Sequence, residues 1–178
     1  MARRRSSKGS EKTTRARVAF RRHPPGEWVA SKARIELSGD RFDVHETDED
    51  GVHWVSLGLP KPNSDGRVRV SFSLRARSRN VIAVWLSGEL SEPPLSEAIL
   101  DLVEGRVAES RPLDETFSIS VRPGEAGAFR VDLDQRFSDA PRSPNMMIAL
   151  RKKLGGPTAY KGEGLAALEL SDVIVWGE

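Results

Sequence analysis

The sequence predicts an all-β fold, an antiparallel β-sandwich that follows a basic N-terminal arm. Three features predict it: segments in which apolar and polar residues alternate, turn signals between them, and a closing run of β-branched residues that ends at Trp176. The chain has 178 residues, which is the size of one domain. No window approaches the roughly 20 apolar residues that a membrane-spanning helix needs, so we expect no membrane span.

Strict alternation marks the strands most clearly. In residues 68–77 (VRVSFSLRAR) positions 68, 70, 72 and 74 are apolar and the positions between them are polar. This period of two indicates a half-buried strand. The same period returns in residues 117–121 and 129–133. These segments fit antiparallel strands, because parallel strands are covered on both faces and show continuous apolar runs. Three runs are closer to continuous and should be more deeply buried, namely 81–86, 146–150 and 168–176.

Turn signals rich in Gly, Pro, Asn and Asp separate these segments, at residues 50–51, 62–66, 79–80, 123–125, 155–157 and 161–164. Strands separated by such turn signals are typical of a sandwich or a barrel. Residues 95–107 leave two alternatives. A helix over 95–103 would be capped by Ser96, whereas a hairpin over 99–107 would turn at Glu104 and Gly105.

The first residues differ from the rest in composition and charge. Residues 1–17 are rich in Ser, Thr, Lys and Arg and cannot bury enough apolar surface to offset the entropy of ordering. Residues 1–22 hold nine Lys or Arg and one Glu, a local charge of +8, so a chain of net charge +2 leaves about −6 for the remainder. We therefore predict a disordered basic arm, residues 1–17, and one sandwich domain, residues 18–178.

Two roles remain open for this arm. It could dock to an acidic protein scaffold, or it could be a solubilising terminus. Nucleic acid is disfavoured as the main partner, because the negative charge of the remainder argues against the basic face that usually binds it. The arm has no apolar core of the kind found in secretory signal peptides. We expect cytoplasmic synthesis, with association with a particle or a surface left open.

Several short segments follow one another in a familiar order: VSFSLRAR leading into RNVIAVWLSG, then LVEGRV, GAFRV, YKGEG and a closing WGE. This order resembles the carbohydrate-binding-module-like jelly-roll domains of phage tail fibres and bacterial polysaccharide-associated proteins. The resemblance runs from residue 68 to the end of the chain. It implies a jelly-roll sandwich, favours the hairpin over the helix at 99–107, and implies glycan binding.

Glycan binding needs aromatic faces on which sugars stack. Trp54 is the best candidate, because Val55 and Leu57 should face the core and leave Trp54 on the outside. Tyr160 is a second candidate, since it stands beside glycines in a loop. Trp85 is either a third platform or a core residue. Trp28 and Trp176 are interpreted as packing residues.

The polar face of the strand at 68–77 carries a basic stripe. Arg69, Arg75 and Arg77 continue it from Arg67, and guanidinium groups match the carboxylates of acidic sugars. The alternative is a solvated sheet face on which these arginines pair with carboxylates of neighbouring strands.

Metal and cofactor sites are sparse in the sequence. There is no cysteine, which excludes disulfides and thiolate ligands. The acidic run at 43–50 does not fit a calcium loop, because the position of the bidentate glutamate falls on Leu57, and it is interpreted as a hairpin turn. Asp172 resembles the last-strand acid that holds a structural calcium in jelly-roll sugar-binding modules; alternatively, it sits at a bulge. No other cofactor is expected.

Catalytic motifs are absent from the sequence. It contains no Gly-x-Ser-x-Gly elbow, no phosphate-binding loop, no His-Glu-x-x-His and only three histidines. We therefore predict a non-catalytic domain that binds a glycan or a surface polysaccharide. The alternative is a structural protein of a phage-like or cell-surface particle that docks through residues 1–17, and an accessory domain of a polysaccharide-processing system is a third. A homo-oligomer is expected.

Overall fold

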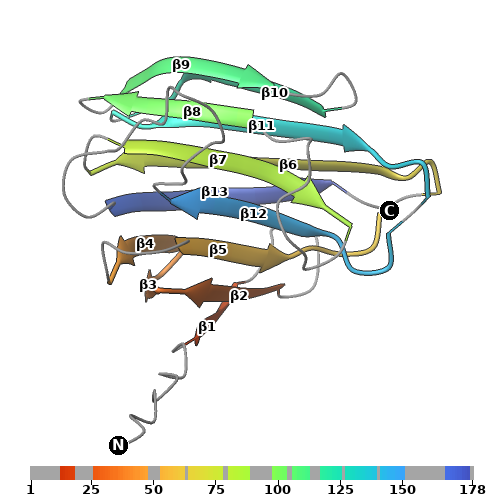
Figure 1. Cartoon of the computed structure of the whole chain (residues 1–178), viewed down its shortest axis with the longest axis horizontal. Helices are drawn as coiled ribbons and strands as arrows, with labels where there is room; N and C mark the ends of the chain where they lie inside the picture. The colour runs from red at the N-terminus through yellow and green to blue at the C-terminus, as the bar shows by residue number, and fades with distance from the viewer. Residues whose placement is uncertain are drawn as a thin grey trace, which may run out of the picture.

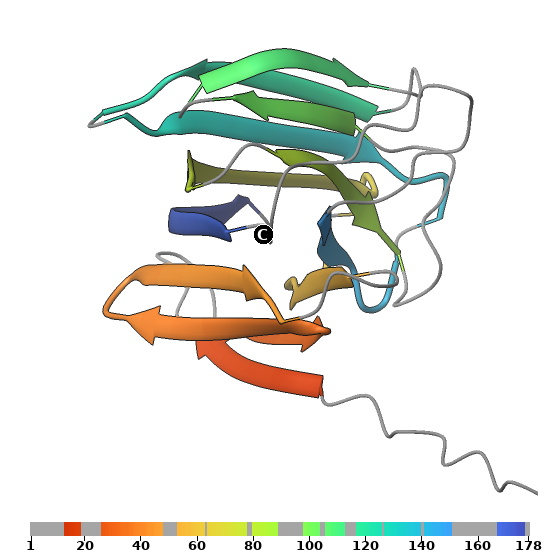
Figure 2. The same ribbon diagram turned by 60° about the vertical axis from the view of Figure 1, so that its left-hand side comes forward.

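The computed structural model describes eleven stretches of the chain, residues 13–18, 26–47, 53–62, 64–77, 80–88, 98–103, 106–112, 117–125, 127–139, 141–150 and 167–176. Within them the chain forms thirteen strands and no helix. The strands form two sheets that lie one in front of the other in Figure 1 and separate into two layers in Figure 2. No helix in these stretches is long and apolar enough to cross a membrane.

The seven-stranded sheet has the order β1-β2-β5-β12-β7-β8-β9. Its strands are β1 (Thr13–Val18), β2 (Gly26–Ser31), β5 (His53–Gly58), β12 (Asn145–Leu150), β7 (Asn80–Ser87), β8 (Ala98–Val103) and β9 (Arg106–Pro112). The six-stranded sheet has the order β10-β11-β6-β13-β4-β3. Its strands are β10 (Phe117–Pro123), β11 (Phe129–Arg136), β6 (Arg67–Ala76), β13 (Ala167–Trp176), β4 (Arg41–Glu46) and β3 (Ala33–Ser38). Every neighbouring pair is antiparallel.

Late strands lie between early ones in both sheets. β13 lies between β4 and β6, and β12 lies between β5 and β7. This interleaving is the topology of a jelly roll, in which the chain folds back so that its last strands fill the centres of both sheets. The predicted antiparallel jelly-roll sandwich is therefore confirmed, with the closing apolar run as the central strand β13.

The hairpin predicted for residues 99–107 is confirmed. β8 and β9 pair antiparallel, and their register ends with Val103 opposite Arg106. The interpretation of residues 43–50 as a hairpin turn is wrong. β4 ends at Glu46 in one sheet and β5 begins at His53 in the other, so the chain crosses between the sheets here. β4 instead forms a hairpin with β3.

The strand β1 shortens the expected N-terminal arm. Residues 13–17 were expected to be disordered, but they pair with β2 in a continuous antiparallel register from Thr13 to Val18. Two threonines and a valine favour an extended backbone in this segment, and β2 offers an edge with which it can pair. Residues 1–12 of the expected arm lie outside the described residues.

The core lies between the two sheets and follows the predicted alternation. In β6 the residues Val68, Val70, Phe72 and Leu74 are all buried, as are the inward residues of β11. Trp28 on β2 packs against Phe42 on β4 of the opposite sheet, with ring centroids 5.2 Å apart. Residues 82–86 and 146–150 are buried on both faces of their strands, as their continuous apolar runs predict.

β13 does not follow one parity from end to end. Leu168 and Leu170 are buried in the first half, and Val173 and Val175 are buried in the second. The register with β6 shifts between Ser171 and Ile174, and Asp172 has a φ of 53° there. A bulge of this kind inserts one residue, so every side chain after it moves to the opposite face. Trp176 therefore faces outward.

Candidate functional site

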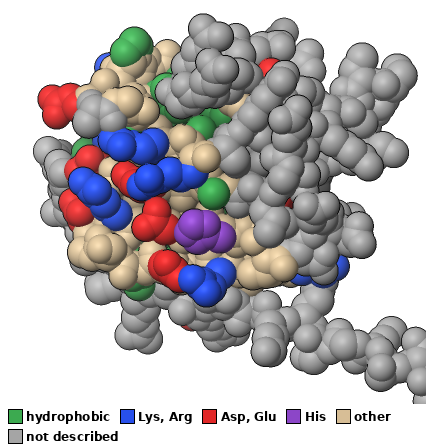
Figure 3. Space-filling view, turned by 90° about the vertical axis from the view of Figure 1, so that its left-hand side faces the viewer, with side chains coloured by type: hydrophobic (Ala, Val, Ile, Leu, Met, Phe, Trp, Pro, Cys, Tyr) green, Lys and Arg blue, Asp and Glu red, His purple; other side chains and the backbone are tan. Residues whose placement is uncertain are grey.

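The outer face of the six-stranded sheet is polar and rich in arginine. Its strands alternate between buried core residues and outward polar residues. The outward arginines are Arg34, Arg41, Arg67, Arg69, Arg75, Arg77, Arg122, Arg130 and Arg136. The outward carboxylates are Glu36, Asp43, Asp132, Asp134 and Glu169. We call this surface the arginine face, and Figure 3 shows one end of it, where arginine, acidic and histidine side chains gather.

Asp134 on β11 organises one end of the arginine face. Arg67 donates to both of its carboxylate oxygens, from Nε at 2.9 Å and from Nη2 at 2.6 Å. Arg69 donates to the same carboxylate through Nε alone, at 3.0 Å. The terminal nitrogens Nη1 and Nη2 of Arg69 make no hydrogen bond to any described residue. Its guanidinium is therefore held through Nε, and the four N–H groups of Nη1 and Nη2 are left to other partners.

The electrostatics of this cluster keep Asp134 ionised. Burial raises the pKa of the Asp134 carboxyl, but hydrogen bonds and charges from Arg67 and Arg69 together outweigh burial and lower the pKa below its ordinary value of 3.8. Asp134 in turn raises the pKa of Arg67. The cluster is thus a fixed arrangement of two cations and one anion at neutral pH.

The lowered pKa predicts how the cluster responds to acid. A depressed carboxyl pKa contributes stability that is fully present above its unfolded value, near 3.8, and is lost as pH falls through the folded value. NMR titration of the Asp134 carboxyl should therefore give a midpoint below 3.8 in the wild type. Arg67→Ala should raise that midpoint, because it removes two hydrogen bonds. A midpoint that does not move would show that Arg67 does not control Asp134.

Trp176 lies beside this cluster. It is directly opposite Arg69 in the register of β13 with β6, and Asp134 is opposite Arg69 on the other side. Directly opposed side chains on one sheet face lie within contact reach. Trp176 is 39% exposed, one of two large exposed apolar residues in the described chain. The register of β13 with β4 ends at Ser171 and Arg41, so no described strand flanks Trp176 on that side.

A second cluster surrounds Glu169 on β13. The Glu169 side chain is 8% exposed and lies within ion-pair distance of three arginines. Arg77 donates to it directly, while Arg41 and Arg75 approach only to 3.9 Å, too far for a hydrogen bond. The Glu169 carboxylate thus lies within ion-pair distance of three guanidinium groups, from β4, from β6 and from the residue after β6.

Hydroxyl groups and one more arginine connect the two clusters. Ser71 and Ser73 lie on β6 between Arg69 and Arg75, and Ser171 is opposite Ser73 on β13. Arg130 crosses this strip, with Nη1 3.4 Å from Ser73 Oγ and 3.2 Å from the carbonyl oxygen of Asp172. Ser71 Oγ is buried and has no hydrogen-bond partner among the described residues.

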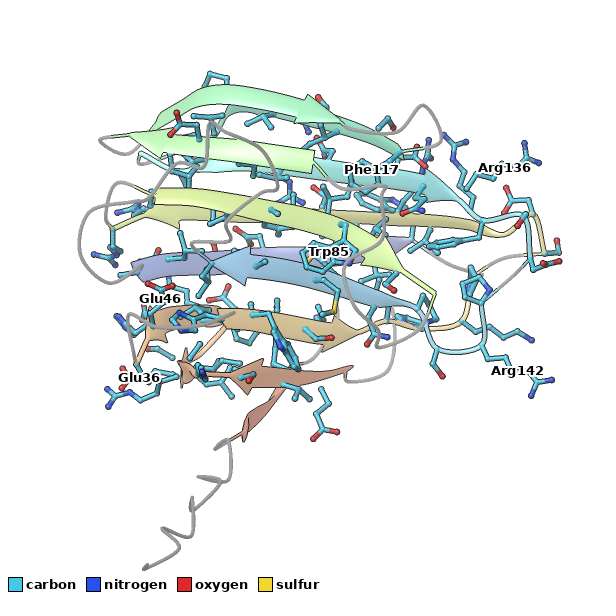
Figure 4. The ribbon with its side chains drawn as sticks, viewed as in Figure 1. Glu36, Glu46, Trp85, Phe117, Arg136 and Arg142 are labelled. Atoms are coloured by element: carbon cyan, nitrogen blue, oxygen red, sulfur yellow. The ribbon has the colours of Figure 1, made fainter. Side chains whose placement is uncertain are left out.

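The structure separates the three aromatic candidates predicted from the sequence. Trp54 is half-buried on the outer face of the seven-stranded sheet, with Val55 and Leu57 inward as predicted. Trp85 is 1% exposed, which favours the core alternative and leaves no ring face available to a sugar; Figure 4 shows its place on β7. Tyr160 lies outside the described residues.

The predicted basic stripe is present, and its arginines meet carboxylates. Arg69 pairs with Asp134, whereas Arg75 and Arg77 approach Glu169. Carboxylate pairing is the alternative to sugar contacts, and both remain compatible at Arg69, whose Nη1 and Nη2 make no hydrogen bond to a described residue. Asp172 sits at the bulge of β13, as its second interpretation predicted. In the described stretches no group of three or more His, Asp or Glu side chains is placed to hold a metal ion.

Sequence reasoning missed Trp176. A strict period of two counted from Leu168 places Trp176 inward, and the apolar residues 173–176 give no alternation that would correct it. The signal that could have found the shift is Ser171-Asp172, two polar residues in an apolar run. Asp tolerates a positive φ better than most residues, so such a pair is typical of a bulge.

Comparisons with known proteins give structural likenesses only. No protein-family model matches the chain, and no curated protein matches it. A solved structure named sialidase is similar with a TM-score of 0.48 and 12% identity; the likeness covers 82% of this chain and 16% of that chain. The chain thus spans less than a fifth of that protein. A structure of TmCBM61 in complex with beta-1,4-galactotriose is similar with a TM-score of 0.42 and 9% identity, covering 85% of this chain and 88% of that one.

Proposed function

We propose that this protein is a non-catalytic glycan-binding domain and that the glycan lies on the arginine face. The observation that carries the proposal is the row formed by Trp176, Arg69 and Asp134 across three adjacent strands. It combines an exposed indole with a guanidinium that a carboxylate holds in place. Sugars have both an apolar ring face and hydroxyl groups, so they need these two kinds of contact together.

Rigidity supports this assignment. The three residues stand on strands of a sheet rather than on loops, and Asp134 fixes Arg67 and Arg69 with three hydrogen bonds. A preformed site binds with less loss of conformational entropy than one whose side chains must be ordered by the ligand. The half-buried Ser73 extends the polar surface along β6 from Arg69.

Two tryptophans on opposite sheets allow a direct test of the site. Trp176→Ala should weaken binding to a glycan identified on an array by about 10- to 100-fold, because a stacked indole contributes about 1.5–3 kcal/mol. Trp54→Ala is the matched control, since it removes the same side chain from the other sheet. Affinity electrophoresis of the full chain through gels that contain the glycan gives both affinities.

The outcomes separate three cases. Loss of binding in Trp54→Ala but not in Trp176→Ala would move the site to the seven-stranded sheet, where the sequence predicted it. Equal binding by both variants would remove tryptophan stacking from the proposal. No binding by the wild type to any glycan would reject the function and favour the assembly alternative, in which residues 1–17 dock to an acidic scaffold. That docking and the homo-oligomer stay predictions.

A further inference from the structure

We propose that the ligand of the arginine face is an anionic glycan, a linear chain whose carboxylate or sulfate groups contact two separate arginine clusters. This inference rests on the proposed function and specifies its ligand. The first cluster is Arg69 with Arg67 and Asp134, beside Trp176. The second is Arg41 with Arg75 and Arg77 around Glu169.

The charge of this face differs in sign from that of the rest of the folded chain. Its nine arginines face five carboxylates, and counting Asp172 at the bulge as a sixth leaves a net charge of +3. Residues 23–178 carry about −6 in total, because residues 1–22 account for +8 of the net +2. A basic face on an otherwise acidic body attracts an anionic partner and orients it toward that face.

The cations of this face are all arginine. The two lysines in the described chain, Lys32 and Lys61, lie outside the strands of the six-stranded sheet. A guanidinium presents a planar fork of donors that matches the two oxygens of a carboxylate or a sulfate, whereas an ammonium is a point charge. The choice of arginine thus fits an oxyanion that is bound with defined geometry.

One arginine of each cluster, Arg69 in the first and Arg41 in the second, has donors that no described residue binds. Arg69 is engaged through Nε only, and its side chain is 48% exposed. Arg41 is 61% exposed, and its one described ion pair, to Glu169, is 3.9 Å long. At that distance Arg41 makes no hydrogen bond to Glu169, and its guanidinium makes none to any other residue that the structure describes. These two arginines are the groups that we expect to contact the ligand directly.

The two clusters are too far apart for one small anion. Arg41 is opposite Ser171, which is opposite Ser73, and Ser73 is four residues along β6 from Arg69. That is about 13 Å along the strands and about 10 Å across them. Glu36 lies in the same cross-strand row as Glu169, and Arg136 is opposite Arg67. In Figure 4 Glu36 lies at one end of the sandwich and Arg136 at the other. A polymer that carries repeated acidic groups spans this distance, and Ser73 and Ser171, which are half-buried, can pair with its hydroxyls.

Polygalacturonate and its methyl ester form the decisive pair of probes, because they share one sugar backbone and differ in charge. The full chain should bind the acid form at least about tenfold more tightly than the ester at physiological salt, since two guanidinium–carboxylate contacts are lost on esterification. The affinities for dextran sulfate and for neutral dextran are compared in the same way, which tests whether sulfate groups are bound. Two other polyanions serve as controls. Polyglutamate has no sugars, and duplex DNA has sugars in a different arrangement.

Arginine variants localise the effect. Arg41→Ala and Arg69→Ala should each weaken binding of the acidic polymer about tenfold and leave binding of the ester unchanged. Arg142→Ala is the matched control, because Arg142 is exposed between β11 and β12 and lies outside the arginine face. Arg69→Lys should not restore affinity, since an ammonium lacks the fork.

The results that overturn the inference differ from those that overturn the function. Equal affinity for acidic and neutral members of both pairs, with loss in Trp176→Ala, would reject the anionic ligand and keep glycan binding. Affinity for polyglutamate or DNA that equals affinity for the acidic glycan would show a general polyanion surface instead. An effect of Arg142→Ala equal to that of Arg41→Ala would show that total charge, not the two clusters, determines binding.

Discussion

Glu46→Ala is expected to lower the free energy of unfolding by about 1–3 kcal/mol, because it removes the carboxylate of a buried hydrogen bond that joins the two sheets. Glu46 Oε1 lies 2.8 Å from His53 Nδ1, and the two side chains are 0% and 1% exposed. Glu46 ends β4 in the six-stranded sheet, and His53 begins β5 in the seven-stranded sheet. The Glu46–His53 hydrogen bond therefore joins the two sheets at the point where the chain crosses between them. Urea denaturation followed by circular dichroism measures the loss.

A double variant distinguishes pairing from simple packing. Glu46→Met combined with His53→Leu replaces both polar groups by apolar side chains of similar size, which is often neutral. We expect this double variant to recover most of the stability lost in Glu46→Ala. Glu46→Gln should fall between the two, because the amide oxygen can still meet the ring nitrogen. A Glu46→Ala variant that loses less than about 1 kcal/mol, the typical effect of one neutral hydrogen bond, would contradict a structural role for the pair.

The sequence predicted most of the sandwich because its strands bury one face and expose the other. Val68, Val70, Phe72 and Leu74 are buried at every second position, which is the signal on which strand prediction depends. The topology required more than local patterning. That β12 and β13 fill the centres of the sheets follows from long-range pairing, and only the resemblance to jelly-roll domains suggested it.

The candidate site was less predictable, for two physical reasons. A bulge at Asp172 moves Trp176 from the core to the surface, and one inserted residue has no strong signature in a strand that is apolar on both sides of it. The net charge of the chain also gave no indication of the arginine face. The body of the chain is acidic overall, which argued against a basic face, yet folding gathers nine arginines on one surface.

Deletion of Asp172 is expected to keep Trp176 on the outer face and to retain the fold and glycan binding. Asp172 is the one extra residue of the bulge, so without it Val173 follows Ser171 directly and takes the position opposite Phe72. Ile174 then stays opposite Ser71, and Val173 and Val175 stay inward. Trp176 therefore remains opposite Arg69, as in the wild type. Urea denaturation and affinity electrophoresis measure stability and binding on the same variant.

Substitutions at the same position provide the control. Asp172→Gly keeps the inserted residue and adopts φ near 53° without strain, so it should retain both the fold and glycan binding. Asp172→Val also keeps the residue count, but a β-branched side chain resists this backbone conformation, and stability should fall by about 1–2 kcal/mol. If the deletion lost glycan binding while Asp172→Gly kept it, the bulge itself, and not only the outward position of Trp176, would contribute to the site. A large loss of stability in the deletion would contradict the parity argument, because removal of the extra residue leaves every inward side chain of β13 on its face.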